Sequence, residues 1–166
     1  MGNPQFNIAI ITVSDRASEG VYDDLSGPAA RDLLTELLTE HEPVFTLQIV
    51  PDNPELLTGA LTTCIEAQCD FIFTTGGTGI GPRDITPEAT RFVLDKEIPG
   101  IAEAIREFSL TKTKSAMLSR GIAGLTGQSI IINLPGSPRA VKEIINFLAP
   151  TLKHSYFMVR GIDVHK

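Results

Sequence analysis

Cysteine is scarce in this chain of 166 residues, which contains Cys64 and Cys69 and no others. The two do not form a Cys-x-x-Cys pair, and no histidine stands near them at the spacing of a metal site. Cys64 falls on the apolar face of an expected helix, and Cys69 lies just before an expected strand. We therefore expect both to be small buried apolar residues without a disulfide bond.

Histidine is nearly as scarce, with three residues. His41, His154 and His165 are scattered along the chain, and we expect them at the surface, on helix ends or in the tail. A zinc site is not expected, because the sequence has no His-x-x-His or His-Glu-x-x-His pattern. A Gly-x-Ser-x-Gly nucleophile elbow is missing as well, which argues against a serine hydrolase.

Long apolar runs are also missing: no stretch approaches the roughly 20 apolar residues that a membrane-spanning helix needs. The first residues contain neither a basic region nor an apolar run of signal-peptide length. Met1-Gly2 does not open a myristoylation signal, because Phe6 stands where Ser or Thr is required. We expect a cytoplasmic protein with no membrane partner.

Positive charge is in deficit. The chain has 14 Lys and Arg against 20 Asp and Glu, a formal net charge of −6, and it contains no basic run. Nucleic acid is therefore not an expected partner. An acidic protein that binds phosphate needs a metal ion or a few local cations. The adjacent carboxylates Asp23 and Asp24 are expected to be solvated, and the length is that of a single domain, residues 1–166.

What the sequence does contain is an alternation of strands and helices. Apolar, β-branched runs predict the strands, and the i, i+3, i+4 spacing of apolar residues predicts the helices, which open with proline at or near their first residue. Strands are expected at 6–13, 44–50 and 71–75, with a hairpin over 121–134, and helices from Pro28, Pro54, Pro87, Pro99 and Pro138. Pro150 is expected to kink the last helix or to start a new segment. This order predicts an α/β fold of three layers, α/β/α, with a mostly parallel sheet and an antiparallel edge hairpin.

In parallel α/β sheets, ligands bind outside the carboxyl ends of the strands. Polar residues follow the expected strands at these ends, and we expect them to meet in one crevice. They are Ser14 and Asp15, Asp52, the segment 75–84, and the segment 133–137. For Asp52 a solvated turn before the next helix remains an equal alternative.

The segment 71–86, FIFTTGGTGIGPRDIT, is the one around which the rest is organised. An expected strand runs into Gly76, Gly77, Gly79 and Gly81, and a helix then opens at 86. Glycine allows backbone N–H groups to approach an anion closely, and a helix N-terminus adds further free N–H groups. The spacing fits neither a Walker A loop nor the dinucleotide-binding pattern. A tight turn without a ligand is the plain alternative.

Asp84 favours the phosphate interpretation of this glycine loop (residues 76–81). A carboxylate beside a bound phosphate is repulsive unless a cation lies between them, so the sequence indicates a metal-bound phosphate, most simply Mg²⁺ with a nucleotide. An ion pair between Asp84 and Arg83, or a carboxylate at the helix end, would also explain this residue.

Five sequence blocks cover nearly the whole chain: AIITVSDRAS, DLSGPAARDLL, IVPDNPE, TTGGTGIGPRDITPEAT and AMLSRGIAGLTGQSIIINLPGSPRAV. In this order they resemble the molybdopterin-binding domain family, which includes the MogA and MoaB proteins and G domains such as that of gephyrin. The PRDITPEAT and AMLSR blocks resemble the adenylyltransferases of the MogA and G-domain type more than MoaB-like members.

The resemblance implies transfer of AMP from ATP to the phosphate of molybdopterin, with release of pyrophosphate, in molybdenum cofactor biosynthesis. It implies Mg²⁺ at Asp52 and Asp84, which would be the catalytic and metal-binding residues. It implies a phosphate loop at Gly76, Gly77, Thr78 and Gly79, and a pterin contact at Ser119. Ser14, Pro135, Gly136 and Ser137 would be further lining. A homotrimer and hand-over to a molybdenum insertase are also implied. A molybdopterin-binding or assembly module without catalysis is the alternative.

Overall fold

The computed structural model describes residues 3–163, and in this part of the chain six strands form one sheet in the order β2-β1-β3-β6-β5-β4. β1, β2, β3 and β6 run parallel, whereas β5 is antiparallel to β6 and β4 is antiparallel to β5. The strands are β1 (Asn7–Val13), β2 (Val44–Val50), β3 (Phe71–Thr75), β4 (Lys96–Glu97), β5 (Ala123–Thr126) and β6 (Ser129–Leu134). The predicted fold class is confirmed, including the antiparallel hairpin at the edge.

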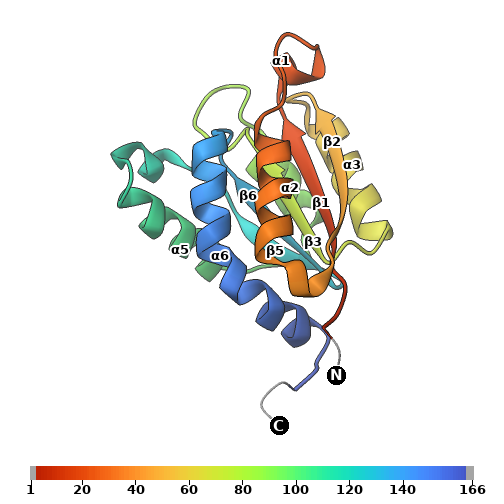
Figure 1. Ribbon diagram of the computed structural model, residues 1–166. Coiled ribbons are helices and arrows are strands. Elements are labelled where there is room, and N and C mark those ends of the chain that lie inside the picture. The colour runs from red at the N-terminus through yellow and green to blue at the C-terminus, as the bar shows by residue number, and fades with distance from the viewer. Residues whose placement is uncertain (1–2, 164–166) are drawn as a thin grey trace.

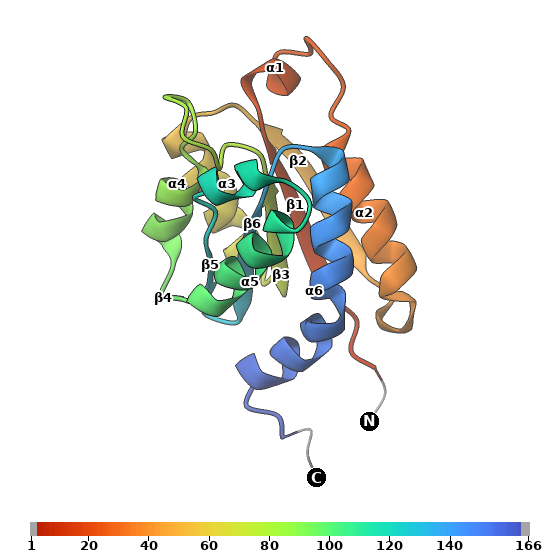
Figure 2. The same ribbon diagram turned by 90° about the vertical axis from the view of Figure 1, so that its left-hand side faces the viewer.

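Helices cover both faces of the sheet (Figure 1). α2 (Ser26–Leu37) and α6 (Pro138–Val159) pack on one face, and α3 (Pro54–Glu66) and α4 (Thr86–Val93) pack on the other. α5 (Pro99–Leu110) lies beside α6, as Figure 2 shows. The remaining elements are the short α1 (Asp15–Ser18) and the 3₁₀ turns η1 (Thr39–His41) and η2 (Lys114–Leu118). In residues 3–163 no helix has the length and apolar character needed to cross a membrane.

Local sequence explains where the helices begin. α3, α4, α5 and α6 each carry proline in their first turn, where its fixed φ suits the helix and its missing N–H is not needed. The side chain of Asn53 caps α3 by accepting a hydrogen bond from the N–H of Leu56. Pro150 lies inside α6, which stays continuous but changes direction along its length (Figure 2). The predicted kink at Pro150 is confirmed. The alternative, a new segment that starts at Pro150, is wrong because α6 continues to Val159.

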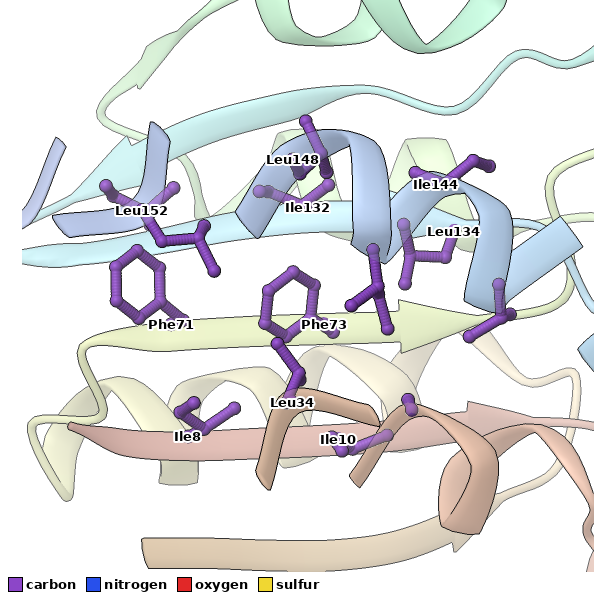
Figure 3. Packing of buried hydrophobic residues seen from close by; sticks show 14 of the residues in the cluster. Ile8, Ile10, Leu34, Phe71, Phe73, Ile132, Leu134, Ile144, Leu148 and Leu152 are labelled. Carbon is purple, nitrogen blue, oxygen red and sulfur yellow. The ribbon is translucent and has the colours of Figure 1, made fainter. Parts of the chain in front are cut away.

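Alternating side chains of the parallel strands fill two cores. Ile8 and Ile10 of β1 and Phe71 and Phe73 of β3 face α2 and α6 (Figure 3). Ile11 of β1 belongs to the other core, under α3 and α4. Because the side chains of a strand alternate between faces, nearly continuous apolar runs were the correct signal for strands buried on both sides.

Three expectations about single residues have mixed outcomes. Cys64 and Cys69 are buried and free, as predicted. His154 is exposed on α6, and His165 lies outside the described residues. The prediction of a surface position for His41 is wrong, because its side chain is buried and its ring stacks on that of Phe6, with the ring centroids 4.0 Å apart. Its Nδ1 lies 2.9 Å from the carbonyl oxygen of Pro4, which satisfies the buried ring.

One further expectation needs correction. Asp24 was expected to be solvated, but it is half-buried and accepts hydrogen bonds from Thr12 Oγ1 at 2.7 Å and from the N–H groups of Ser26 and Gly27. Asp24 therefore holds the start of α2 against the end of β1.

Candidate functional site

The glycine loop leaves β3 in a conformation that depends on its first two glycines. Gly76 and Gly77 have φ values of 93° and 65°, in the left-handed region that side chains avoid. A Cβ on Gly76 would lie 2.5 Å from the carbonyl oxygen of Val13, and one on Gly77 would lie 2.4 Å from Thr86 Oγ1. Thr86 fastens the loop to the start of α4, because its Oγ1 donates to the carbonyl of Gly76 at 2.9 Å and its N–H donates to that of Gly77 at 3.0 Å.

Asp52 reaches the loop from the end of β2. A Cβ added to Gly77 would lie 3.4 Å from Asp52 Oδ1, so the two residues are in contact. Asp52 Oδ2 accepts a hydrogen bond from the N–H of Asp15, at 2.9 Å. Burial raises the pKa of Asp52 above its usual value, and the charges of Asp15 and Asp84 add to the increase. The N–H of Asp15 and the charge of Arg83 act in the opposite direction on the Asp52 pKa.

Asp15 joins Asp52 to Arg83. The Arg83 guanidinium donates to both carboxylate oxygens of Asp15, with distances of 2.8–3.0 Å. This hydrogen bond, and next to it the N–H of Asp52, hold the pKa of Asp15 below its usual value. The alternative in which Arg83 forms an ion pair with Asp84 is therefore wrong, because Arg83 turns across the crevice to the residue that follows β1 and Ser14.

Asp84 folds back over the second half of the glycine loop. Its Oδ2 accepts the N–H of Gly81 at 2.8 Å, and Cβ atoms on Gly79 and Gly81 would lie 2.8 and 2.9 Å from the same oxygen. The N-cap of α4 is Ile85, and no side chain caps this helix. Asp84 is therefore not a helix-capping carboxylate, and its side chain lies against the loop instead.

Arg120, which sequence reasoning did not single out, fixes the loop from the other side. Its Nε donates to the carbonyl oxygen of Gly79 and its Nη2 to that of Asp84, both at 2.7 Å, while its Nη1 pairs with Glu88. Its N–H donates to the carbonyl oxygen of Thr78 at 2.8 Å. One residue thus holds the glycine loop, the segment after η2 and the first turn of α4 together. The AMLSR block contained this arginine, but nothing in its local pattern pointed to the loop.

A cavity of about 430 Å³, called here the large cavity, opens between α5, η2, the start of α6 and the glycine loop. Figure 2 shows α5 and α6, two of the elements that line the cavity, side by side. The predicted site residues on its wall are Thr78, Gly79, Ser119, Pro135 and Ser137. Its other polar or charged lining residues include Arg106, Ser109, Lys112, Asn133, Arg139 and Glu143. Sequence reasoning missed Arg106, Arg139 and Glu143, although Arg139 follows directly on the Pro-Gly-Ser-Pro turn.

A smaller cavity of about 130 Å³ lies on the other side of the strand ends, between the segment after β1 and the start of α6. Ser14, Gly76 and Gly136 are on its wall. Ser14 Oγ caps α1 by accepting the N–H of Ala17 at 3.2 Å and lies 3.0 Å from the hydroxyl of Tyr22. A Cβ on Gly136 would lie 3.4 Å from the Cα of Gly76, so the two loops touch. The predicted crevice residues are therefore brought together at the strand ends, but they are divided among two cavities and an acidic group, Asp15, Asp52 and Asp84, that lines neither cavity.

The acidic residues at the glycine loop carry the oxygen donors that Mg²⁺ prefers. Within residues 3–163, no group of three His, Cys, Asp or Glu side chains is placed to hold a metal ion. Asp52 and Asp84 nevertheless offer hard oxygen donors on two sides of the glycine loop. Mg²⁺ is usually held by one or two carboxylates and completes its shell with substrate phosphates and water. The two carboxylates fit such an ion.

Known proteins resemble this chain over most of its length. Residues 9–154, most of the chain, match the family described as "Probable molybdopterin binding domain". This chain belongs to the molybdopterin-binding domain family. Within the family, the molybdopterin adenylyltransferase of Helicobacter pylori strain J99 is 43% identical over 157 residues, which cover 93% of this chain and 88% of the relative. That of Escherichia coli K12 is 40% identical over 139 residues, 83% of this chain and 71% of the relative.

Solved structures of the family share the fold. The molybdopterin biosynthesis Mog protein from Mycobacterium ulcerans superposes with a TM-score of 0.86 at 42% identity, covering 93% of this chain and 99% of that one. The resemblance noted in the sequence motifs is therefore confirmed, and the relatives are molybdopterin adenylyltransferases of molybdenum cofactor biosynthesis.

Proposed function

We propose that this chain transfers AMP from ATP to the phosphate of molybdopterin and releases pyrophosphate. The observation that carries the proposal is the position of the glycine loop. Thr78 and Gly79 form part of the wall of the large cavity, whereas Asp52 lies against Gly77 and Asp84 against Gly79 and Gly81. A phosphate bound on this loop would be accessible both to a molecule in the cavity and to an ion held by the two carboxylates.

The chemistry needs little from the protein beyond placement. The nucleophile is an oxygen of the substrate's own phosphate, which is already ionised at neutral pH, so no serine, cysteine or histidine nucleophile is required. A bond forms between this oxygen and the α-phosphorus of ATP, the bond from the α-phosphorus to the bridging oxygen breaks, and pyrophosphate leaves with that electron pair. Orientation and charge neutralisation then account for the acceleration.

Each predicted site residue has a role in this proposal. The loop formed by Gly76, Gly77, Thr78 and Gly79 binds phosphate through its N–H groups. Asp52 and Asp84 are the catalytic carboxylates and would hold Mg²⁺, which screens the two anionic reactants and polarises the α-phosphate. Ser119 contacts the pterin in the large cavity. Ser14, Pro135, Gly136 and Ser137 are further lining of the two cavities.

The same proposal covers assembly and location. Residues 1–166 form a single molybdopterin-binding domain that acts in the cytoplasm as a homotrimer and hands its product to a molybdenum insertase. Support for association comes from the edge strand β2, which exposes Val44, Leu47 and Ile49 by 50%, 37% and 43%. Apolar residues on an unpaired edge strand are a common place for subunits to meet.

A product assay tests the proposal. Purified protein is incubated with molybdopterin, ATP and Mg²⁺, and adenylylated pterin and pyrophosphate are measured, with each component omitted in turn. We expect product only when all three are present. Pterin binding without product would instead support the binding or assembly module, and ATP turnover that ignores molybdopterin would indicate a different nucleotidyltransferase.

A further inference from the structure

Glu143 is the one acidic side chain among the described residues that line the large cavity. The charged side chains that share this wall are the cations Arg106, Lys112 and Arg139. A single carboxylate in a site that also binds a phosphate-bearing anion is unfavourable unless a cation or a hydrogen-bond donor pairs with it. Glu143 therefore requires an explanation that phosphate binding does not provide.

The backbone of α6 places Glu143 on the cavity wall. Ala140, Glu143 and Ile144 are spaced i, i+3, i+4, so they share one face of the helix, and all three line the cavity. Across from them, Ala102, Ile105, Arg106 and Ser109 of α5 line it with the same periodicity. Aliphatic side chains of both helices, Ala102 and Ile105 of α5 and Ala140 and Ile144 of α6, therefore share the cavity wall with Glu143. A mostly apolar wall with a few polar groups suits a heterocyclic ligand.

The present partner of Glu143 is easily displaced. Arg139 Nε donates to Glu143 Oε1 at 3.0 Å within the same helix, and the Arg139 side chain is 85% exposed, against 29% for Glu143. Exposed i, i+4 pairs of this kind contribute little to stability, and the order with the cation first is the weaker one. The other two cations of the wall have their own contacts, Arg106 with the carbonyl of Gly121 at 2.8 Å and Lys112 over the ring of Phe108.

We infer that Glu143 recognises the pterin by accepting hydrogen bonds from its 2-amino group and its N3–H. These two donors lie side by side on the pyrimidinone ring, and a carboxylate with two oxygens is their matching acceptor. Arg139 turns outward into solvent when the ring enters. The inference rests on the proposed function, because it takes the large cavity as the pterin site.

The structure makes Glu143 a specificity-determining residue for the ring and leaves the phosphate end to the glycine loop. A lumazine, which carries oxygen in place of the 2-amino group, presents an acceptor to the carboxylate and is rejected. A site built around a charged hydrogen-bonding group discriminates strongly against an analogue that cannot pair with it.

The test measures binding of two stable ring probes, 6-hydroxymethylpterin and 6-hydroxymethyllumazine, by calorimetry, to the wild-type protein and to Glu143→Gln. The wild type is expected to prefer the pterin, and Glu143→Gln to reduce this preference about 10- to 100-fold, as for loss of a charged hydrogen bond. Equal affinity of the wild type for both probes, or an unchanged preference in Glu143→Gln, overturns the inference.

Two control variants separate recognition from fold. Glu107→Gln changes an exposed glutamate of α5 that does not line the cavity, and it should leave the preference as it is. Arg139→Ala removes the competing guanidinium and should tighten pterin binding about twofold to threefold, as expected for a weak exposed pair. If Arg139→Ala weakens pterin binding as much as Glu143→Gln does, the role assigned to Glu143 is wrong.

The two hypotheses can fail separately. Adenylylated product without a pterin preference would leave the proposed function standing and remove the role of Glu143. A pterin preference that depends on Glu143, in a protein that makes no product, would support the role of Glu143 and contradict the proposed adenylyltransferase function.

Discussion

Asp15 and Asp52 each accept a hydrogen bond from the other's backbone N–H, with both distances at 2.9 Å. The ends of β1 and β2 are therefore joined through their side chains, and the Asp52 carboxylate has one oxygen fixed. Asp15 is held in turn by Arg83 of the loop after β3. The carboxylate that we assign to the metal is thus oriented by both neighbouring strand ends, which is the arrangement that a preorganised site requires.

Asp52→Asn is expected to lower adenylylation roughly 100-fold or more, the size of effect seen when one preorganised electrostatic group is removed. Pterin binding should be almost unchanged, because Asp52 does not line the large cavity. Steady-state kinetics and calorimetric pterin binding measure the two. Equal losses of turnover and pterin affinity would contradict the assignment, and Asp23→Asn, at an exposed position, is the matched control.

The raised pKa of Asp52 also predicts how activity and stability depend on pH. Activity should fall as the pH drops through this pKa, at a higher pH than for an ordinary aspartate with its value of 3.8. Above 3.8 the unfolded chain releases the proton more readily than the folded protein, so stability decreases as pH rises across the shifted range. Asp52→Asn should therefore be no less stable than the wild type at neutral pH. Thermal melts of both proteins across this pH range measure the difference in stability. A clear destabilisation of Asp52→Asn at pH 7 would show that the Asp52 carboxylate has a structural role.

Asp84→Ala is expected to abolish most turnover and to raise the Mg²⁺ concentration needed for half-maximal activity. The side chain contacts Gly79 and Gly81 of the loop, so its loss removes a metal ligand and also loosens the phosphate site. Asp84→Asn, which keeps an acceptor for the N–H of Gly81, separates the two effects: it should restore the stability but not the rate. Full adenylylation activity in either variant would show that Asp84 is not a catalytic or metal-binding residue.

Arg120→Lys is expected to reduce kcat about tenfold, because a lysine ammonium cannot donate to the carbonyl oxygens of Gly79 and Asp84 at the same time. The planar guanidinium of arginine holds its donors in a fixed fork, whereas the ammonium of lysine is a single compact charge. Leaving these carbonyls unpaired should also cost roughly 1–3 kcal/mol of stability. Turnover with saturating substrates and chemical unfolding measure the two effects. Arg120 would be no more than a structural residue if kcat stayed at the wild-type value while stability fell.

Glu88→Gln serves as the comparison for Arg120. The Arg120 hydrogen bond lowers the pKa of Glu88 below 4.5, so the pair stabilises the protein above that pH and is lost as the pH falls through the lowered value. The pair is partly exposed, so its contribution is about 0–1 kcal/mol. A loss of stability in Glu88→Gln that is the same at pH 7 and at pH 3 would contradict the pairing.

Gly77→Ala is expected to destabilise the protein by about 1–3 kcal/mol, because alanine is strained at a φ of 65°. Its Cβ would also displace Thr86 Oγ1, which anchors the loop to α4. Gly59→Ala is the matched control: this glycine lies in α3 with no atom within 4 Å of an added Cβ, and alanine should stabilise the helix by about 0.5–1 kcal/mol. Urea unfolding distinguishes the two, and equal effects would mean that the loop conformation is not required.

The features that were predictable from the sequence were local ones. Apolar runs located β1, β2 and β3, and prolines in the first turn located the starts of four helices, because both signals act within a few residues. The convergence of Ser14, Asp52 and the glycine loop followed from one topological rule, since the carboxyl ends of parallel strands meet at one edge.

The features that were missed depend on partners far along the chain. β4 has two residues and exists only because it pairs with β5. His41 is buried by stacking on Phe6, 35 residues earlier in the sequence. The carboxylate of Asp24 accepts a hydrogen bond from the hydroxyl of Thr12. The guanidinium of Arg120 donates a hydrogen bond to the glycine loop, some 40 residues before it in the sequence. No periodicity marks such contacts, so a helix wheel could place Glu143 on a face but not at a cavity.

The length of β1 determines where the crevice residues that follow it, Ser14 and Asp15, are placed. Its two faces are sealed by different helix layers, with Ile10 on one side and Ile11 on the other. A single inserted residue would advance Ser14 and Asp15 by about 3.3 Å and exchange the faces of the side chains beyond it. The same insertion in the exposed stretch 18–23 would disturb neither layer. A change of length in that stretch should therefore be tolerated, whereas the packing of both cores fixes the distance from the start of β1 to the Asp15–Asp52 pair.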